Sequence, residues 1–290
     1  MAKKAQRYLN RLGLHLERAR QRFRQSGFSN FDEERMLGEF VARLVPHDAR
    51  ARTAVDIGAG DGIRGSNTYA LFRQGWRGVG FEGDERRARR LARAYKNFKE
   101  VEARRALVTP SNIVSLLREH SVPEDFGVLS LDIDSYDYWV LDSILESFRP
   151  RVVVTEINEK IPPPVRFVVK YDPDFQLQYH FFGYSIASLE ELCERHSYAL
   201  IALEYNNAFI APRELTEGLR PLDAATAYRR GYLERPDRRE RFPRNHDMEV
   251  LHSMNPAESI EFLRRFFARH EGKFDLSVAE TPEPLEAAHT

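Results

Sequence analysis

Short apolar runs alternate with helical patterns over the middle of the chain. Between residues 53 and 158, segments typical of buried strands are separated by segments whose apolar residues recur at helical spacing. The expected strands cover residues 53–58, 77–84, 104–109, 126–134 and 149–158, and the expected helices cover 67–76, 85–98, 111–120 and 138–148. Strands that alternate with helices of this length are parallel and joined by crossovers. This part of the chain therefore predicts an open sheet with helices on both faces.

The pattern changes after residue 158. Residues 159–185 are rich in proline and aromatic residues and predict a long loop with one hairpin, followed by a helix over 189–196. Two further apolar runs, 198–205 and 207–212, predict an antiparallel pair that closes the sheet. The expected fold class is α/β: a Rossmann-like, mostly parallel, seven-stranded sheet with helices on both faces, N-terminal helices and a helical C-terminal extension.

The chain is expected to have three parts. Residues 1–50 form an N-terminal helical extension, and its first helix, over 1–27, is basic and amphipathic. For this helix, packing on the domain or on a partner subunit is favoured over contact with a membrane surface or RNA. Residues 51–213 form the cofactor-binding domain. Residues 214–290 form a C-terminal extension with a helix over 257–270 and a disordered tail, and this extension is a lid, an oligomer contact or a surface cover.

Capping patterns predict where several helices begin. Asn30 is expected to cap the second helix, and Thr109 with Pro110 to begin the helix after the third strand. Ser188 and Glu191 have the spacing of a capping box for the helix before the last two strands.

Composition excludes several classes of protein. Lys and Arg number 44, and so do Asp and Glu, so no overall basic field recruits nucleic acid and no nucleic-acid partner is expected. The one cysteine, Cys193, excludes an intrachain disulfide and a multi-cysteine zinc site. No apolar run reaches the roughly 20 residues of a membrane span, and the basic N-terminus lacks the apolar core of a secretory signal. A cytoplasmic location is therefore expected.

The segment VDIGAGDG, residues 55–62, carries the clearest sign of a binding site. An apolar strand there turns sharply into a helix, and Gly58, Gly60 and Gly62 permit positive φ and close approach of the backbone to a ligand. Glu82 ends the next strand, where an acid accepts hydrogen bonds from the hydroxyls of a ribose. Glycines with a distal acid indicate a cofactor that contains adenosine.

Two classes of cofactor fit this turn. The run GDGIRG satisfies the dinucleotide pattern G-x-G-x-x-G, so an NAD-binding protein is the main alternative. Counted from Gly58, where the strand ends, the third glycine of that pattern falls on Ile63. Asp56 within the strand and Asp61 after it suit the ammonium and sulfonium of S-adenosylmethionine (SAM), whereas a pyrophosphate needs the helix N-terminus free of negative charge. These residues favour SAM.

A second acidic group is expected at the carboxyl edge of the sheet. Asp132 and Asp134 end the fourth strand, and Glu156 and Asn158 end the fifth. Side chains two residues apart share a face of a strand, so the four groups converge where open α/β sheets bind ligands. No Lys or Arg lies in either motif, and the resulting repulsion favours a bound cation. Oxygen ligands favour Mg²⁺; the alternative is that these acids cap helices and bind water.

At this point the sequence resembles the class I SAM-dependent methyltransferases. Their D-x-G-x-G-x-G motif is matched by Asp56, Gly58, Gly60 and Gly62, and they share a seven-stranded sheet with an antiparallel pair at its end. The resemblance implies SAM as the cofactor.

Over residues 53–212 the sequence further resembles the FkbM-type branch, whose members methylate oxygen on sugars and polyketides. The segments that carry this resemblance are SLDIDSYDYWVLDSI, PRVVVTEIN, FFGYSIASLEEL and NNAFI. Ser135 and Ile210 depart from the family pattern. Metal dependence carries over from related enzymes at Asp132, Glu156 and Asn158.

Each candidate residue has an expected role. The cofactor ligands are Asp56, Gly58, Gly60, Asp61, Asn67, Glu82, Thr109 and Asp132, and the metal ligands are Asp132, Asp134, Glu156 and Asn158. The catalytic candidates are Asp132, Asp134 and His180, with Asp137 as a further candidate base. His180 lies in the aromatic loop expected to cover the site, and a histidine titrates near neutral pH.

The expected reaction is an SN2 transfer of methyl from SAM to an oxygen of a small-molecule acceptor, such as a sugar, a polyketide or another secondary metabolite, with Mg²⁺ as a possible second cofactor. Two alternatives stay open: an NAD-dependent oxidoreductase or epimerase, and a non-catalytic cofactor-binding partner subunit. A homo-oligomer formed through the terminal helices also stays open.

Overall fold

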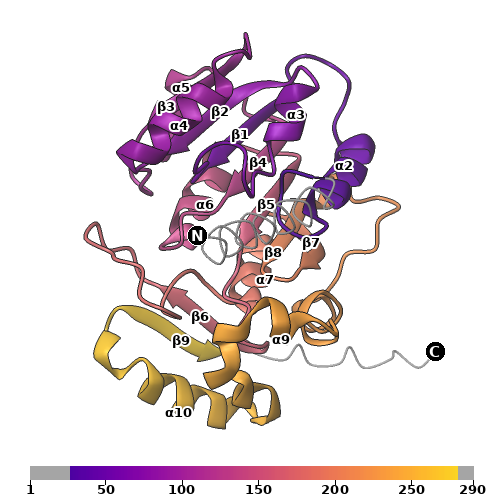
Figure 1. The fold of residues 1–290 in the computed structure, drawn as a ribbon. Helices are drawn as coiled ribbons and strands as arrows, with labels where there is room; N and C mark the ends of the chain where they lie inside the picture. Colours follow the sequence, from indigo (N-terminus) through magenta and orange to yellow (C-terminus); the bar gives the residue numbers. More distant parts are fainter. Residues whose placement is uncertain (1–26, 280–290) are drawn as a thin grey trace, which may run out of the picture.

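A seven-stranded sheet forms the centre of the computed structural model, which describes residues 27–279 (Figure 1). Its strand order is β3-β2-β1-β4-β5-β8-β7. The strands are β1 (Thr53–Ile57), β2 (Arg77–Glu82), β3 (Val101–Arg105), β4 (Val128–Leu131), β5 (Val152–Glu156), β7 (Tyr198–Glu204) and β8 (Asn207–Pro212). The first five are parallel, and β8 is antiparallel to both of its neighbours. The expected α/β, Rossmann-like fold class is confirmed.

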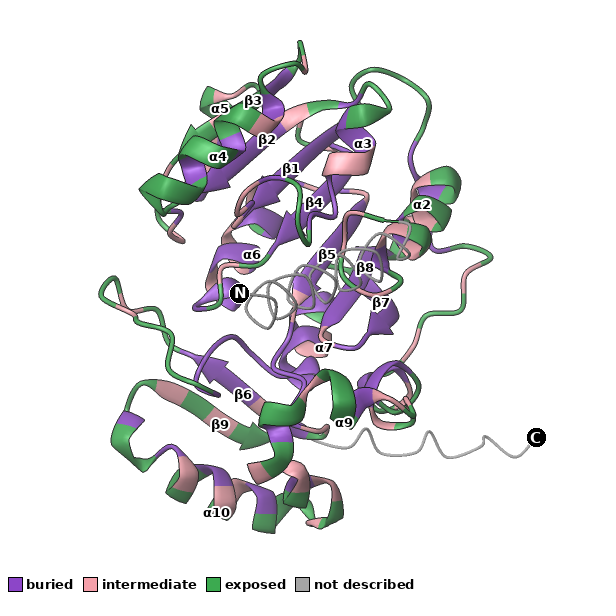
Figure 2. Ribbon diagram, viewed as in Figure 1, coloured by how far each residue is buried: buried purple, intermediate pink, exposed green. Residues whose placement is uncertain are grey.

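Helices cover both faces of this sheet (Figure 2). One face carries α2 (Glu33–Leu44), α3 (Tyr69–Arg73) and α4 (Glu85–Tyr95), and the other carries α5 (Ile113–Glu119), α6 (Asp137–Ser147) and α7 (Ile186–Arg195). The side chains of β1 divide between the two layers, because successive residues of a strand point to opposite faces. Val55 and Ile57 pack with α5, α6 and α7, whereas Ala54 packs with α2, α3 and α4.

A second, two-stranded sheet lies below the first. It pairs β6 (Val165–Val169) antiparallel with β9 (Phe274–Val278), and α10 (Pro256–Phe266) packs on it. Phe167, Leu263 and Phe267 belong to a separate apolar core there. The expected long loop over 159–185 is therefore wrong in part, because the apolar run RFVV belongs to a strand that pairs with β9, far along the chain. The expected turn back of this segment is present, with antiparallel bridges between Val168 and Tyr184 and between Gln178 and Phe181.

Short helices connect β8 to α10. They are a 3-10 turn (Arg213–Leu215), α8 (Ala224–Tyr228), a π-helix (Arg229–Leu233), α9 (Arg238–Arg241) and two further 3-10 helices (Pro243–Asp247 and Glu249–Ser253); another 3-10 turn, Ala268–His270, follows α10. The boundary between 51–213 and 214–290 remains a prediction. Strand β9 lies beyond this boundary and pairs with β6, which lies before it.

Three predicted helix starts are wrong by a few residues. Helix α2 begins after Asp32 instead of Asn30. Asn112 Oδ1 accepts a hydrogen bond from the Thr109 backbone N–H at 2.8 Å, so the roles expected before α5 are reversed. Ser185, and not Ser188, caps α7. In each case several cap-forming residues follow one another, and the path of the loop off the sheet selects among them.

The predicted basic helix over 1–27 and the predicted tail over 280–290 lie outside the described residues, apart from residue 27. Within residues 27–279, no helix combines the length and the apolar character needed to cross a membrane.

Candidate active site

The glycine turn after β1 is packed against the end of β4. Gly58 has φ 83°, and a Cβ atom there would lie 1.7 Å from the carbonyl oxygen of Asp132. The turn is held by Glu82, whose Oε2 accepts a hydrogen bond from Gly60 N–H and whose Oε1 accepts one from Asp84 N–H, both at 2.8 Å. Because Gly58 has no side chain, the ends of β1, β2 and β4 can lie this close together.

A pocket of about 250 Å³ opens beside this turn. Its lining includes Gly58, Glu82, Asp84 and Arg87, the backbone segment 106–108, and Asp132, Asp134 and Tyr136. Among these residues, the carboxylates outnumber the one guanidinium, so the pocket is acidic. The pocket lies at the carboxyl edge of the sheet, where the sequence predicts a ligand site.

Asp56 is not among the residues that line this pocket, so its contact with the cofactor stays a prediction. Its side chain points to the α2–α4 face of the sheet and is 4 % exposed. Its Oδ2 accepts hydrogen bonds from the hydroxyls of Thr68 (2.6 Å) and Ser66 (3.3 Å). Burial raises the pKa of Asp56 to about 6. This acid ties the loop after the glycines to the strand.

Three other predicted cofactor ligands also lie off the pocket. Asp61 Oδ1 accepts hydrogen bonds from the backbone N–H groups of Ile63 and Arg64, at 3.0 and 2.9 Å. Asn67 lines a separate cavity of about 270 Å³ under α2. Thr109 follows the segment 106–108 that lines the first pocket and is not part of the lining. None of these three residues lines the first pocket, so their contact with a cofactor stays a prediction.

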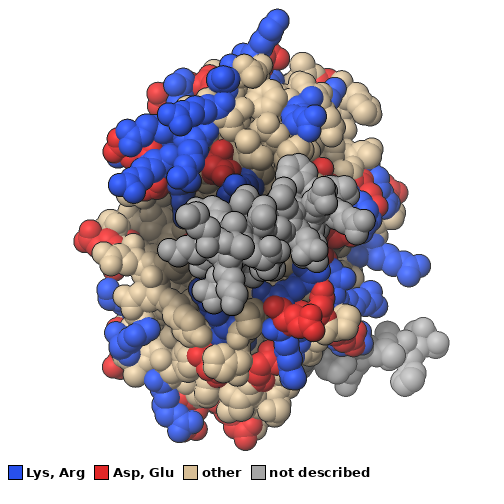
Figure 3. Space-filling model, in the orientation of Figure 1, with Lys and Arg blue, Asp and Glu red and all other residues tan. Residues whose placement is uncertain are grey.

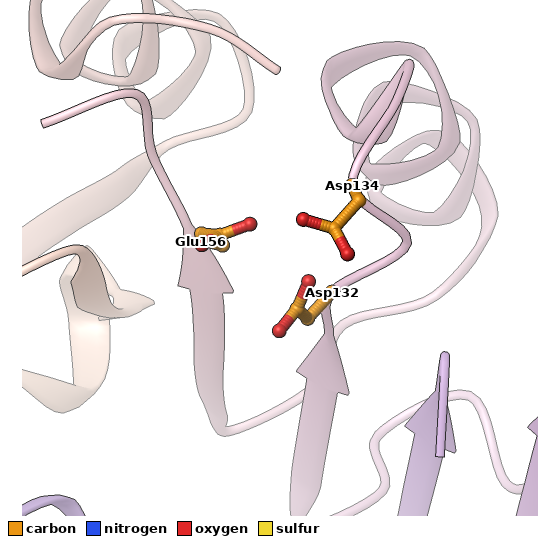
Figure 4. A group of neighbouring side chains, drawn as sticks. All are labelled: Asp132, Asp134 and Glu156. Atoms are coloured by element: carbon orange, nitrogen blue, oxygen red, sulfur yellow. The ribbon is translucent and has the colours of Figure 1, made fainter. Parts of the chain in front are cut away.

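Asp132, Asp134 and Glu156 converge as the sequence predicts (Figure 4). Each offers a carboxylate oxygen, and these atoms lie within 4.8 Å of one another. Asp134 has φ 54°, a left-handed conformation that Asp tolerates better than most residues. Asp137 holds this turn, because its carboxylate accepts hydrogen bonds from Ile133 N–H (2.8 Å) and Ser135 N–H (2.9 Å). Asp137 is thereby committed to the backbone and is not free to act as a base.

Burial among protein atoms is the main cause that raises the pKa of each acid in the cluster. The charges of neighbouring carboxylates add to it at Asp132, whose pKa is raised to about 7, and at Glu156, whose pKa is raised well above its usual range. The pKa of Asp134 is raised less, because Arg87 and Lys160 oppose the effect of its burial. Neither cation belongs to the motifs that carry the acids, so positive charge reaches the cluster from other parts of the chain.

Asn158 occupies a different place from the one expected of a metal ligand. Its Nδ2 donates to the carbonyl oxygens of His180 (2.9 Å) and Phe182 (3.0 Å), and its Oδ1 has no partner among the described residues. The amide that contacts the acids is Asn206, whose Nδ2 donates to Glu156 Oε1 at 2.6 Å. The sequence motif NN at the turn into β8 could have predicted an amide near the acids, because β8 pairs with β5 and Asn207 lies opposite Glu156.

A second pocket, of about 510 Å³, lies on the other side of the acids. Glu156 lines it, whereas Asp132 and Asp134 line the first pocket. Its other walls come from the segment after β5, the aromatic loop 177–182 and the C-terminal segment 241–245. The carboxylate cluster therefore stands between two pockets.

His180 lines the second pocket, but neither ring nitrogen is open to it. The side chain is 2 % exposed; Nε2 is hydrogen-bonded to Asp247 Oδ1 at 2.8 Å, and Nδ1 is buried without a partner among the described residues. Burial and the charge of Lys160 lower the pKa of His180. This geometry does not support His180 as a base, and Asp132 and Asp134, which are both exposed, remain the candidates.

Basic side chains gather over α4 near the mouth of the first pocket (Figure 3). The apolar side of α4 is buried through Ala88, Leu91 and Tyr95, so its arginines face outward. Of these, Arg87 reaches the pocket lining. The rest form a solvated helix face, as the amphipathic pattern predicts.

No protein-family model and no curated protein matches this chain. Its fold is similar to that of several solved structures. A SAM-dependent methyltransferase from Aquifex aeolicus is 12% identical with a TM-score of 0.36, and the match covers 62% of this chain and 88% of that one. A TehB-like SAM-dependent methyltransferase from Corynebacterium glutamicum is 16% identical (TM-score 0.37; 69% and 99% covered). A protein of the NADB-Rossmann superfamily from Streptococcus agalactiae is 10% identical (TM-score 0.41; 84% and 95% covered). Similarity at this level does not choose between the two cofactor classes, so that choice rests on the site.

Proposed function

We propose that this protein is a SAM-dependent methyltransferase that methylates an oxygen of a small-molecule acceptor. The observation that carries the proposal is the carboxylate cluster between two pockets at the carboxyl edge of a Rossmann-like sheet. The pocket beside the glycine turn takes the cofactor, and the larger pocket takes the acceptor. The resemblance of the sequence to FkbM-type enzymes supports oxygen as the methylated atom.

The charge of the first pocket favours SAM over a dinucleotide. Its carboxylates, on Glu82, Asp84, Asp132 and Asp134, suit a ligand with an ammonium and a sulfonium, whereas they repel a pyrophosphate. Each oxygen of Glu82 accepts one backbone hydrogen bond and keeps a lone pair for a ribose hydroxyl.

The residues between the pockets provide the chemistry at the acceptor. SAM, when bound, supplies a methyl group on a positively charged sulfur. Asp134 is placed to accept the proton of the acceptor hydroxyl, whose oxygen would take the methyl group from SAM and leave S-adenosylhomocysteine. Asp132, Asp134 and Glu156 would hold a Mg²⁺ ion through the oxygen ligands that it prefers, and the ion would lower the pKa of an acceptor hydroxyl.

Calorimetry with S-adenosylhomocysteine, with Mg²⁺ or EDTA, tests this proposal. We expect S-adenosylhomocysteine to bind and NAD(H) not to bind. In a turnover assay with SAM and a panel of hydroxylated acceptors, Asp132→Asn and Glu156→Gln are expected to lower kcat/KM by at least about 100-fold. Glu119→Gln, at an exposed position on α5, serves as the control.

Each alternative gives a different result. Binding of NAD(H) in place of S-adenosylhomocysteine would identify an oxidoreductase or epimerase. Cofactor binding without any turnover that depends on Asp132 and Glu156 would identify a non-catalytic subunit. If EDTA does not change the turnover rate, the proposed metal site is wrong and the proposed methyltransferase activity stands.

A further inference from the structure

We infer that the second pocket recognises an anionic group, a carboxylate or a phosphate, on its ligand, and that the C-terminal extension supplies this recognition. The identity of the ligand as the methyl acceptor rests on the proposed function. The binding itself does not depend on it and is tested separately below.

The C-terminal segment is fixed against the sheet edge by side-chain contacts. Asn245 Nδ2 donates to Glu159 Oε1 at 2.7 Å, and Tyr179 Oη donates to the carbonyl oxygen of Arg244 at 2.9 Å. The His180–Asp247 hydrogen bond adds a third link. Because Glu159 follows β5 closely, these contacts make the extension a rigid wall of the pocket beside Glu156. These three hydrogen bonds favour a fixed pocket wall over a loosely attached surface cover.

The cations of this pocket are not all neutralised. Lys160 is 7 % exposed, with Nζ 3.1 Å from the Glu159 carboxylate and 4.4 Å from the centre of the Phe182 ring. Its ammonium has three N–H donors, so a single carboxylate partner leaves donor capacity. Arg241 pairs with Asp237. Arg244 is exposed at the rim and has no ion pair with any residue between 27 and 279.

The two ends of the pocket therefore differ in charge. Glu156 lies at one end with the other acids behind it, and the buried Lys160 lies near them, whereas the exposed Arg244 provides positive charge at the rim. Tyr179 and Phe242 supply aromatic surface in the same lining. A ligand that matches these features has a hydroxyl at the end near the acids, a flat or apolar body, and an anionic group that a guanidinium binds in bidentate fashion.

Binding of small aromatic anions tests the inference directly. Calorimetry would use benzoate and phenyl phosphate as anions and methyl benzoate as the neutral analogue, on the full chain with and without S-adenosylhomocysteine. We expect one or both anions to bind at least about tenfold more tightly than methyl benzoate and to bind more weakly as salt is raised. Benzoate and phenyl phosphate together show which anion the site prefers.

Variants assign the effect to this pocket. Arg244→Met is expected to abolish the preference for the anions, and Lys160→Gln to reduce it. Arg93→Met, which removes an exposed arginine of α4, is the control and should change nothing. Circular dichroism would check that each variant folds, because Lys160 is buried. Failure of both anions to bind, equal binding of methyl benzoate, or an unchanged preference in Arg244→Met would overturn the inference. If S-adenosylhomocysteine fails to bind while the anions bind through Arg244, the proposed function falls and this inference stands.

Discussion

Glu33 is a carboxyl group held out of water at the start of α2. It is 0 % exposed, and Asn207 Nδ2 donates to its Oε1 at 2.7 Å, while Oε2 has no partner among the described residues. Burial is the main cause that raises its pKa to about 8, and the charges of Glu204 and Asp132 add to it. At neutral pH this carboxyl therefore keeps its proton in the folded protein and loses it on unfolding.

The stability of the protein should consequently depend on pH through Glu33. The folded-state pKa lies above the unfolded value of 4.5, so the folded state binds more protons between pH 4.5 and about 8, and the free energy of unfolding falls as pH rises through that window. Glu33→Gln removes this dependence. We expect the variant to gain on the order of 2–4 kcal/mol relative to wild type on going from pH 5 to pH 8.

Urea denaturation at several pH values measures this difference. Glu39→Gln, at an exposed position of the same helix, is the control and should follow wild type at every pH. A constant difference between Glu33→Gln and wild type across the window would show that Glu33 titrates normally.

At the scale of the element, the turn after β1 depends on space as well as on backbone conformation. Gly58 and Gly75 both have φ 83°. A Cβ atom at Gly58 would meet the backbone of Asp132, whereas a Cβ atom at Gly75 would meet nothing within 4 Å. Alanine substitutions at the two positions therefore distinguish the loss of stability caused by a left-handed backbone conformation from the loss caused by a steric clash.

Alanine at the two positions should have different effects. Gly75→Ala is expected to cost about 1 kcal/mol of stability and to leave cofactor binding unchanged. Gly58→Ala should cost more than that and weaken the binding of S-adenosylhomocysteine at least about tenfold, because the turn must move away from β4. Thermal denaturation and calorimetry measure both effects. Equal losses in the two variants would mean that the close approach of Gly58 to Asp132 is unimportant.

The whole molecule has apolar cores that serve different pockets. The two cores on either face of the large sheet support the cofactor pocket, and the third, around β6, β9 and α10, supports the loop and extension that enclose the second pocket. A substitution that leaves a cavity in the third core should therefore weaken ligand binding in the second pocket alone.

Leu263→Ala tests this division of roles. Leu263 is 0 % exposed in the third core, so the substitution is expected to cost about 2–5 kcal/mol in stability. Benzoate should bind more weakly, while the affinity for S-adenosylhomocysteine should stay within about twofold. Val250→Ala, at a position 41 % exposed, is the control. A parallel loss of both ligands would show that the cores behave as one unit.

The alternation of apolar and helical segments was sufficient to predict the large sheet. Periodicity reports which residues a strand or helix buries, and regular alternation of strands with helices is typical of a parallel sheet with crossovers, including the pairing of β1 with the distant β4. The pairing of β6 with β9 was not predictable in this way, because its two strands are separated by several helices and each alone resembles part of a loop. Similarly, the converging acids at Asp132, Asp134 and Glu156 followed from strand ends, whereas Lys160 came near them only through the path of the chain after β5.

The sequence by itself determined the fold class, the glycine turn with Glu82, and the meeting of three carboxylates at one sheet edge. These features follow from local spacing, because strand ends and side-chain alternation fix them. Only the tertiary structure decided which way side chains off the strands point. It left Asp56 and Asn67 outside the lining of the cofactor pocket, buried the ring of His180 against Asp247, and placed the C-terminal extension beside Glu156. Those outcomes depend on contacts between distant segments, which no local pattern records.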